Sequence, residues 1–274
     1  MEAERKDIVW LDYARFIGIF LVVFGHALQK IPDWQNIGTI KLSWDYIYLF
    51  HMPLFFVISG YLYRKEETQK ANRGGVKILY TLVIPYIFYQ VIYLPVALFQ
   101  YRHQLSVPEL CQKLFLGIIA GDGYETPYSL PICLPCWFII CIIQLRILFL
   151  AVHINRKTSI GLSFLSMMFL LIRHNFGFDV YFCIDSTIMA IPYFLFGHYL
   201  KKIVIRIDNS SYWLLVGGVI ISGFIVWLAL QFNGAAQMNG PSYGNNLLFN
   251  YVAGCCGSIM VFLIAVVLSK LIGA

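Results

Sequence analysis

Residues 8–29 read IVWLDYARFIGIFLVVFGHALQ, an apolar run that carries an arginine and a histidine near its two ends. A helix needs about 20 mostly apolar residues to cross the hydrocarbon core of a bilayer. The run is too long for a secretory signal peptide and has no small-residue cleavage site, so we expect it to stay as the first membrane span. Charge inside a bilayer is costly, which makes Arg15 and His26 functional candidates.

The whole chain has the same apolar character. Of its 274 residues, 59% are hydrophobic and 12% are charged, about half the charged share of a soluble domain, and the mean hydropathy is +0.72. A soluble protein of this size cannot bury so much apolar surface. Composition therefore excludes a soluble globular domain, a disordered chain and a nucleic-acid-binding module.

We predict an all-α, polytopic transmembrane helix bundle with about eight spans. The expected spans are 8–29, 44–63, 76–99, 132–152, 158–172, 180–200, 212–231 and 246–269. The stretch 108–120 is amphipathic and is expected to lie along the membrane surface. With a cytoplasmic N-terminus, thirteen of the twenty Lys and Arg residues fall in inner segments and five in outer ones. This bias follows the positive-inside rule and explains the net charge of +6 without nucleic acid.

Within the first span, Arg15 and His26 are expected to share one face. They are eleven residues apart, which on an α-helix is about 20° past three full turns and about 16 Å along the axis. Gly18 and Gly25 fall near the same stripe, where small residues let a neighbouring helix or a ligand approach. Asp12 precedes Arg15 by three residues and can pair with it. We expect the two groups to line a shared passage through the first helices.

A second histidine follows in the sequence FHMPLFFVISGY at 50–61. His51 and His26 are predicted to lie at similar depths in the outer half of the membrane. Pro53 frees a backbone carbonyl that we expect to accept a hydrogen bond from His51. A buried imidazole is neutral near pH 7 and can take a proton from an alcohol while an acyl group is delivered. Arg15, nearer the cytoplasm, suits a donor that carries phosphate.

Plainer interpretations of these groups remain open at this point. Arg15, held by Asp12, can snorkel to the inner headgroups, and His26 can make an interhelical hydrogen bond without chemistry. The same buried groups would also serve a proton-coupled transporter of a polar solute, although we find no repeat symmetry of the kind that transporters show. A non-catalytic membrane scaffold is the third alternative.

Four ordered motifs resemble the membrane acyltransferase type 3 family. The first motif is an acidic residue followed by an arginine and, after ten intervening residues, a histidine, here Asp12, Arg15 and His26. The stretch 50–61 is similar to the family's second-span motif, Cys136-Trp137-Phe138 to its Trp-Phe span start, and 191–199 to the span that ends in Gly-Tyr.

This resemblance implies transfer of an acyl group, commonly acetyl, from cytoplasmic acyl-CoA to a carbohydrate hydroxyl on the outer side. The acceptor would be a cell-surface glycan or its lipid-linked precursor, and the protein would be a multi-pass cell-membrane enzyme. His26 would act as general base or carry the acyl group briefly, and His51 would assist. A basic pair before the third span, here Arg73 and Lys77, would bind CoA.

The resemblance also implies one integral-membrane acyltransferase domain over residues 1–274. The family usually has about ten spans, which leaves open whether C-terminal helices are missing. No tightly bound cofactor is expected, because acyl-CoA is a substrate, and the oligomeric state stays open.

Further candidates come with simpler explanations. Arg146 either meets CoA phosphates or snorkels, and we favour snorkelling. Asp185 either orients a histidine or pairs with Arg173. Tyr124 and Glu125 would bind sugar hydroxyls, although ordinary loop polarity also explains them. Cys133-x-x-Cys136 has metal or redox spacing, but no second pair completes a zinc site, so we expect packing thiols and no metal. The remaining polar residues of the outer loops that we considered as sugar ligands are Asp122, Asp179 and Tyr243.

Overall fold

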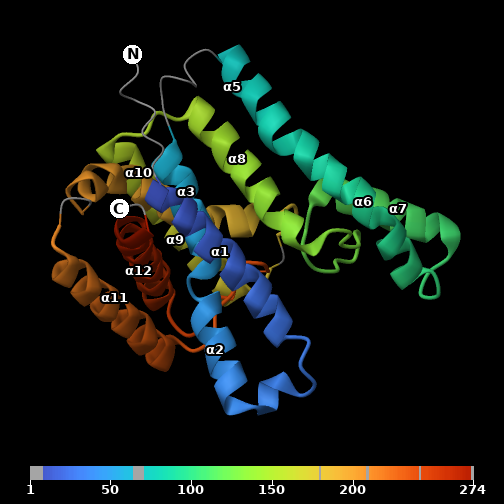
Figure 1. Ribbon diagram of the computed structural model, residues 1–274. Coiled ribbons are helices and arrows are strands. Elements are labelled where there is room, and N and C mark those ends of the chain that lie inside the picture. Colours follow the sequence, from blue (N-terminus) through green and yellow to red (C-terminus); the bar gives the residue numbers. More distant parts are fainter. Residues whose placement is uncertain (1–8, 64–70, 179, 208–209, 241, 273–274) are drawn as a thin grey trace. The chain divides into compact units, whose positions relative to one another are not determined.

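The computed structural model describes residues 9–63, 71–178, 180–207, 210–240 and 242–272, with only the backbone described at 71–73 and 202–207 (Figure 1). Across these residues all regular structure is helical, apart from one isolated bridge between Gln237 and Ser242. The predicted all-α architecture is confirmed.

Six of the described helical segments are long and apolar enough to cross a membrane. They are Val9–Leu28, Gly74–Tyr101, Leu134–Ala151, Arg156–Phe176, Tyr212–Asn233 and Leu247–Ile272. Each corresponds to one of the eight predicted spans, and the short prediction 158–172 proves to be a 21-residue helix. Six of the eight predicted spans are thus matched by such segments among the described residues, and the other two predictions, 44–63 and 180–200, are not.

The predicted span 44–63 is interrupted. Helix α2 (Gly38–Tyr48) ends before Leu49 and α3 (His51–Leu62) begins after Phe50, so neither helix reaches the length of a full span. Periodicity and hydropathy continue across this turn, and the sequence pattern alone does not reveal it. In the region 180–200, α10 (Ile184–Ile207) begins with Asp185 in its first turn and runs on into the basic pair Lys201–Lys202.

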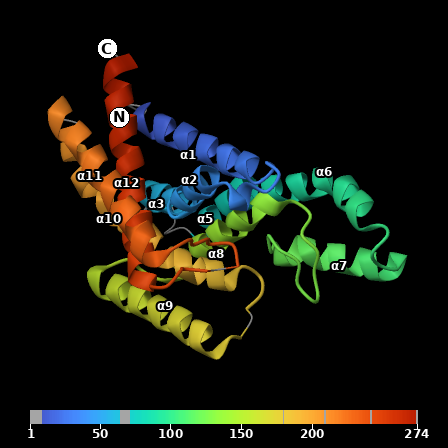
Figure 2. The same ribbon diagram turned by 90° about the horizontal axis from the view of Figure 1, so that it is seen from below.

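The chain divides into two compact units. Unit 1 comprises Met1–Leu62, Tyr193–Gln237 and Ser242–Ala274. It holds α1 (Val9–Leu28), η1 (Trp34–Asn36), α2, α3, the part of α10 from Tyr193 onward, α11 (Tyr212–Asn233) and α12 (Leu247–Ile272). Helices α11 and α12 run alongside each other, and α12 also packs on α1 and α3 (Figures 1 and 2). Helix α12 has the largest buried share of the six long segments, which makes it the core of this unit.

Glycines let α3 and α10 approach each other closely in unit 1. A Cβ placed at Gly60 would overlap the carbonyl of Phe194, and one placed at Gly197 would overlap the carbonyl of Val57. Small residues at a crossing allow two backbones to meet, which is a common way for membrane helices to gain packing contacts. The pair of contacts fixes α3, and with it the position of His51 at the start of that helix.

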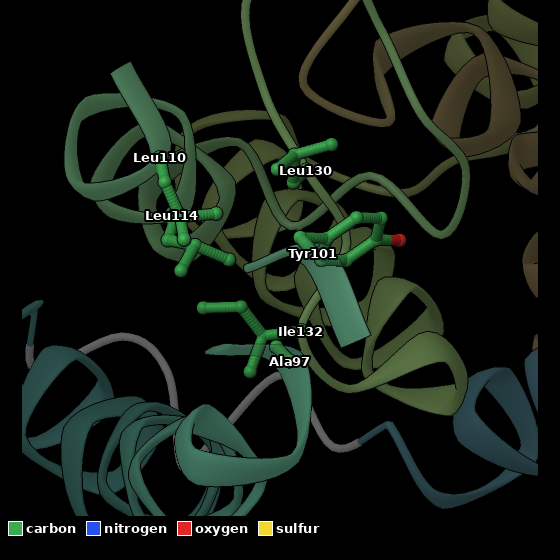
Figure 3. Close-up of a cluster of buried hydrophobic side chains, with 6 residues drawn as sticks. All are labelled: Ala97, Tyr101, Leu110, Leu114, Leu130 and Ile132. Atoms are coloured by element: carbon green, nitrogen blue, oxygen red, sulfur yellow. The ribbon is translucent and has the colours of Figure 1, made fainter. Parts of the chain in front are cut away.

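Unit 2 comprises Tyr63–Pro192 and Met238–Pro241. It holds α5 (Ala71–Ile78), η2 (Leu79–Val83), α6 (Ile84–Tyr101), α7 (Val107–Ala120), η3 (Leu134–Cys136), α8 (Trp137–Ala151), α9 (Arg156–Phe176) and the first part of α10. The amphipathic stretch 108–120 is confirmed as helix α7. Its apolar side chains pack with those of α6 and of the loop 121–133, as Figure 3 shows for Ala97, Tyr101, Leu110, Leu114, Leu130 and Ile132.

Backbone contacts hold this loop on α7. The amide of Leu130 donates to the carbonyl of Lys113 at 3.1 Å, and Gly117 lies directly under the carbonyl of Leu130. The loop 121–133 carries Asp122, Tyr124 and Glu125. Its attachment to α7 therefore sets the positions of these polar candidates.

Candidate functional site

Helix α1 presents Arg15 on its exposed side. The guanidinium Nη1 lies 2.7 Å from Oδ1 of Asp12, which confirms the predicted pair, and both side chains are largely exposed. Gly18 and Gly25 are buried on the adjoining face of α1, about 60–80° around the helix from Arg15, so the prediction that they share the side of Arg15 and His26 is wrong. A Cβ at Gly18 would lie 2.9 Å from Cζ of Phe55, so the predicted close approach of a neighbouring helix is confirmed here.

His26 lies in the last turn of α1 and, like Arg15, is exposed. Its Nδ1 is 3.2 Å from Oε1 of Gln29. With the amide oxygen as acceptor, Nδ1 carries the ring proton and Nε2 keeps its lone pair in the neutral ring. This imidazole is therefore both reachable and oriented to accept a proton at Nε2.

His51 has the opposite environment. It is 3% exposed, and its Nδ1 is 3.0 Å from the carbonyl oxygen of Ile47. The acceptor is therefore a carbonyl of the last turn of α2, not the one that Pro53 frees, because the chain turns at Leu49 and Phe50. The last carbonyls of a helix lack intrahelical donors, and that of Ile47 accepts from the amide of Phe50 at 3.1 Å as well as from His51. The bond from Nδ1 also leaves Nε2 of His51 as the basic nitrogen.

Tyr48 lies between the two histidines. Its ring centroid is 6.5 Å from that of His26 and 4.5 Å from that of His51. Gly25 makes room for it, since a Cβ there would lie 2.9 Å from Cε2 of Tyr48. Trp44 stacks on the other side of Tyr48 with a centroid distance of 3.8 Å. Tyr48 is not among the candidates predicted from the sequence. Its position three residues before His51 is the feature of the sequence that could have identified it.

The structure therefore brings His26 and His51 together around one tyrosine, as their predicted depths suggested. Arg15 lies on the same exposed side of α1, about 16 Å from His26 along the axis. In the described part of unit 1, both Arg15 and His26 face outward. Unit 1 by itself does not enclose a passage around them.

The cationic candidates other than Arg15 belong to unit 2. The guanidinium carbon of Arg146 lies 5.8 Å from the ring centroid of Tyr63, close enough for a cation–π contact. Tyr63 is itself fixed, because its hydroxyl donates to the carbonyl of Phe149 at 2.7 Å. Lys77 lies exposed on α5, and α5 packs against α8, which carries Arg146. Arg73 is in α5, but its side chain lies outside the described residues.

The outer polar candidates of unit 2 gather around Cys183. Asp122 is 4% exposed, and its Oδ1 accepts a hydrogen bond from the amide of Cys183 at 3.0 Å. Its Oδ2 is buried and has no hydrogen-bond partner among the described residues. Burial raises the pKa of the Asp122 carboxyl, while the hydrogen bond from Cys183 opposes that rise. A buried carboxylate oxygen without a donor is unusual in folded proteins and points to a ligand or to a bound proton.

Asp185 is fully buried at the start of α10 and pairs with Arg173 of α9. Its Oδ2 is 3.1 Å from Nη2 of Arg173, in an ionic contact that is not aligned as a hydrogen bond. Of the two alternatives for Asp185, the pair with Arg173 is thus confirmed. The other oxygen of Asp185 accepts from the amide of Ser186 at 2.7 Å, which fixes the carboxylate.

Tyr124 and Glu125 differ in their surroundings. Tyr124 is half-buried; burial raises its pKa, and the charges of Asp185 and Asp122 raise it further. Its phenol is consequently a neutral donor at physiological pH. Glu125 is exposed on the loop. Asp179 lies outside the described residues, and Tyr243 is buried in unit 1. Within the described residues, no group of three or more His, Cys, Asp or Glu side chains could hold a metal ion.

Comparisons with known proteins found a matching family model and related curated proteins. The family model of the acyltransferase 3 group, described as an acyltransferase domain, matches residues 8–274. The nodulation protein NolL of Sinorhizobium fredii is 47% identical over 62 residues, which cover 22% of this chain and 16% of that protein. NolL of Mesorhizobium japonicum is 39% identical over 93 residues, or 31% of this chain and 23% of that protein.

The matched stretches span less than a quarter of the length of these curated relatives. No solved structure matches the chain significantly.

Proposed function

This chain belongs to the acyltransferase 3 family, and from that membership we propose that it moves an acyl group from acyl-CoA to a hydroxyl on the far side of the membrane. The donor enters from the cytoplasm, and the simplest acyl group is acetyl. The acceptor is a carbohydrate at the cell surface or its lipid-linked precursor. The protein is a multi-pass membrane protein, and we place it in the cell membrane.

The observation that carries the proposal is the pair of histidines around Tyr48. His26 is exposed, has its Nδ1 proton engaged by Gln29, and offers Nε2 as a base. In the proposed reaction, the oxygen of the acceptor hydroxyl attacks the thioester carbonyl while Nε2 of His26 takes the hydroxyl proton. The CoA thiolate then leaves and takes the proton back from the imidazolium, so that the histidine is restored. His51, buried beside Tyr48, assists by fixing this aromatic group.

The donor would be held by cations. Arg15 carries the first contact to the CoA phosphates, because a guanidinium binds phosphate oxygens with two parallel hydrogen bonds. The distance of about 16 Å between Arg15 and His26 is one that an extended pantetheine arm is long enough to bridge. Lys77, Arg146 and Arg73 supply further positive charge to the phosphates in this proposal.

The acceptor would be recognised by the polar groups of the outer loop. The phenol of Tyr124 donates, and the carboxylates of Glu125 and Asp185 accept, which together match the donors and acceptors of a polyol. Asp185 would exchange one of its contacts, the Ser186 amide at Oδ1 or Arg173 at Oδ2, for a sugar hydroxyl.

The test is His26→Ala in cells that make the acceptor, with His103→Ala as the matched control. His103 is an exposed histidine outside the site, hydrogen-bonded to Arg102. Loss of a general base lowers the rate by about 10²–10⁴-fold. We expect the acyl mass on surface glycans, measured by mass spectrometry at equal protein levels, to fall by at least about 100-fold in His26→Ala only.

Full acylation by His26→Ala would remove this residue from the mechanism. Proton-coupled solute uptake into proteoliposomes without any consumption of acyl-CoA would replace acyl transfer by the transporter alternative.

A further inference from the structure

Two thiols of unit 2 face each other at the start of α8. The Sγ atoms of Cys133 and Cys136 are 3.0 Å apart, and both residues are buried. The buried thiols of Cys141 and Cys183 also interact with each other, and the Cys141 thiol lies 3.7 Å from the carbonyl oxygen of Cys183. A disulfide bond is about 2.05 Å long, so the sulfurs of Cys133 and Cys136 need to move by about 1 Å to bond.

The backbone holds the two residues in this arrangement. Cys133 ends the loop 121–133, and the turn Leu134–Cys136 leads directly into α8. The amide of Cys136 donates to the carbonyl of Cys133 at 2.9 Å, which closes the turn and keeps both side chains on one side. Tyr86 packs against both cysteines and anchors the turn to α6, with its hydroxyl donating to the carbonyl of Ile118 at 2.6 Å.

We propose that Cys133 and Cys136 form a reversible oxidation site, which a small-molecule or protein disulfide converts to an intramolecular disulfide. The thiolate of one cysteine attacks a sulfur of the oxidant and releases one thiol, leaving a mixed disulfide on the chain. The second thiolate then attacks the protein sulfur of that mixed disulfide and releases the second thiol. Two electrons pass to the oxidant, the two thiol protons leave the protein, and one S–S bond forms in the chain.

The bond would tie the outer loop to the first turn of α8. Gly123 of this loop lies against Trp137, because a Cβ there would be 2.9 Å from Cδ1 of Trp137. The loop also receives a hydrogen bond from Asn239 to the carbonyl of Gly123 at 3.1 Å. The Lys and Arg distribution predicts that this end of α8 faces outward, where disulfides persist. The oxidised pair would thus fasten the loop that carries Asp122 and Tyr124.

The experiment treats the full chain in native membranes with increasing oxidised glutathione, then quenches with acid, alkylates under denaturing conditions and digests with trypsin. Cleavage after Lys113 and Arg146 gives one peptide that contains Cys133, Cys136 and Cys141. We expect this peptide to carry one alkyl group, on Cys141, and to lack two hydrogens. The midpoint, which is the concentration of oxidised glutathione at which half of this peptide carries the disulfide, should be about tenfold lower than for the same chain unfolded in dodecyl sulfate.

Two variants test the assignment. Cys133→Ser should abolish the link within the peptide, whereas Cys255→Ser, which changes a cysteine of unit 1 on α12, should leave the midpoint unchanged. The proposal is overturned if all three thiols are alkylated while the exposed Cys111 has become a glutathione adduct. It is equally overturned if the folded and unfolded chains share one midpoint, or if Cys141 enters the disulfide as often as Cys133. None of these readouts depends on acyl transfer.

Discussion

The two candidate histidines show how environment divides one residue type into two roles. Both have Nδ1 engaged by an oxygen, which leaves Nε2 with the lone pair in each ring. His26 is exposed and can meet a substrate, whereas His51 is buried under the end of α2 and holds Tyr48. Sequence alone placed both residues at similar depths but could not distinguish them, because exposure depends on how α1, α2 and α3 pack.

Asp122 provides a residue-scale prediction about stability and pH. Burial raises its pKa in the folded chain above the unfolded value near 4, so folding favours the protonated acid. The resulting stabilisation is complete below the unfolded pKa and is lost as pH rises through the folded pKa. Asp122→Asn is always neutral and should therefore gain stability over the wild type as pH rises.

We expect Asp122→Asn to be more stable than the wild type by about 1 kcal/mol at pH 8 and to match it near pH 4. Thermal unfolding in detergent, followed by tryptophan fluorescence at both pH values, measures the difference. Glu109→Gln is the control, because Glu109 is an exposed carboxylate on α7 that pairs with Lys113 at 3.4 Å. If Asp122→Asn were more stable than the wild type by the same amount at both pH values, the charge of the Asp122 carboxylate would not be the cause.

At the scale of elements, the contact of α3 with α10 gives a second prediction. Gly60→Ala places a methyl group against the carbonyl of Phe194, and backbone cannot yield as a side chain can. Overpacking of this kind costs about 1–3 kcal/mol. Gly161→Ala in the middle of α9 is the matched control, because nothing lies within 4 Å of its Cβ position. That control should instead stabilise the helix by about 0.5–1 kcal/mol.

Thermal unfolding of both glycine variants in detergent is the measurement, and the two shifts should have opposite signs. Stability of Gly60→Ala equal to that of the wild type would show that α3 and α10 do not meet at these carbonyls.

The ends of the elements were less predictable than their existence. Helix α9 starts earlier than expected because Asn155 accepts from the amides of Lys157 and Thr158, while the Thr158 hydroxyl accepts from the amide of Asn155. This capping box is a local signal that hydropathy overlooks. The turn at Leu49 and Phe50 has no such signal, since both residues are apolar and buried at 1% and 2% exposure. This turn arises from packing, and the periodicity of the sequence does not indicate it.

For the whole molecule, composition was sufficient to predict a polytopic membrane protein. The uneven distribution of Lys and Arg was sufficient to predict a topology. Hydropathy located six segments that the structure confirms as long helices. Contacts between residues far apart in sequence, such as Asp122 with Cys183 or Cys133 with Tyr86, could not be predicted from the sequence. They depend on how loops fold back over helices, which a single sequence does not reveal.

The predicted topology can be checked on either side of α8. In a cysteine-free background, Glu125→Cys on the outer loop should react with a membrane-impermeant maleimide in intact cells. Lys157→Cys, at the start of α9, should react only after the cells are permeabilised. Both positions are exposed, so packing does not hide either one. The reverse pattern would show that the N-terminus lies outside, against the positive-inside rule.

The interruption between α2 and α3 has an electrostatic consequence. A helix of 12 residues is about 18 Å long, so α3 ends well short of the ~30 Å hydrocarbon core. If its cytoplasmic end reaches the boundary, its N-terminus lies at mid-depth, where water cannot screen it. The partial positive charge of about half a unit at that terminus then acts across a medium of low polarity. The field points outward from His51 and favours any negative charge that develops on an acyl carbonyl oxygen nearby.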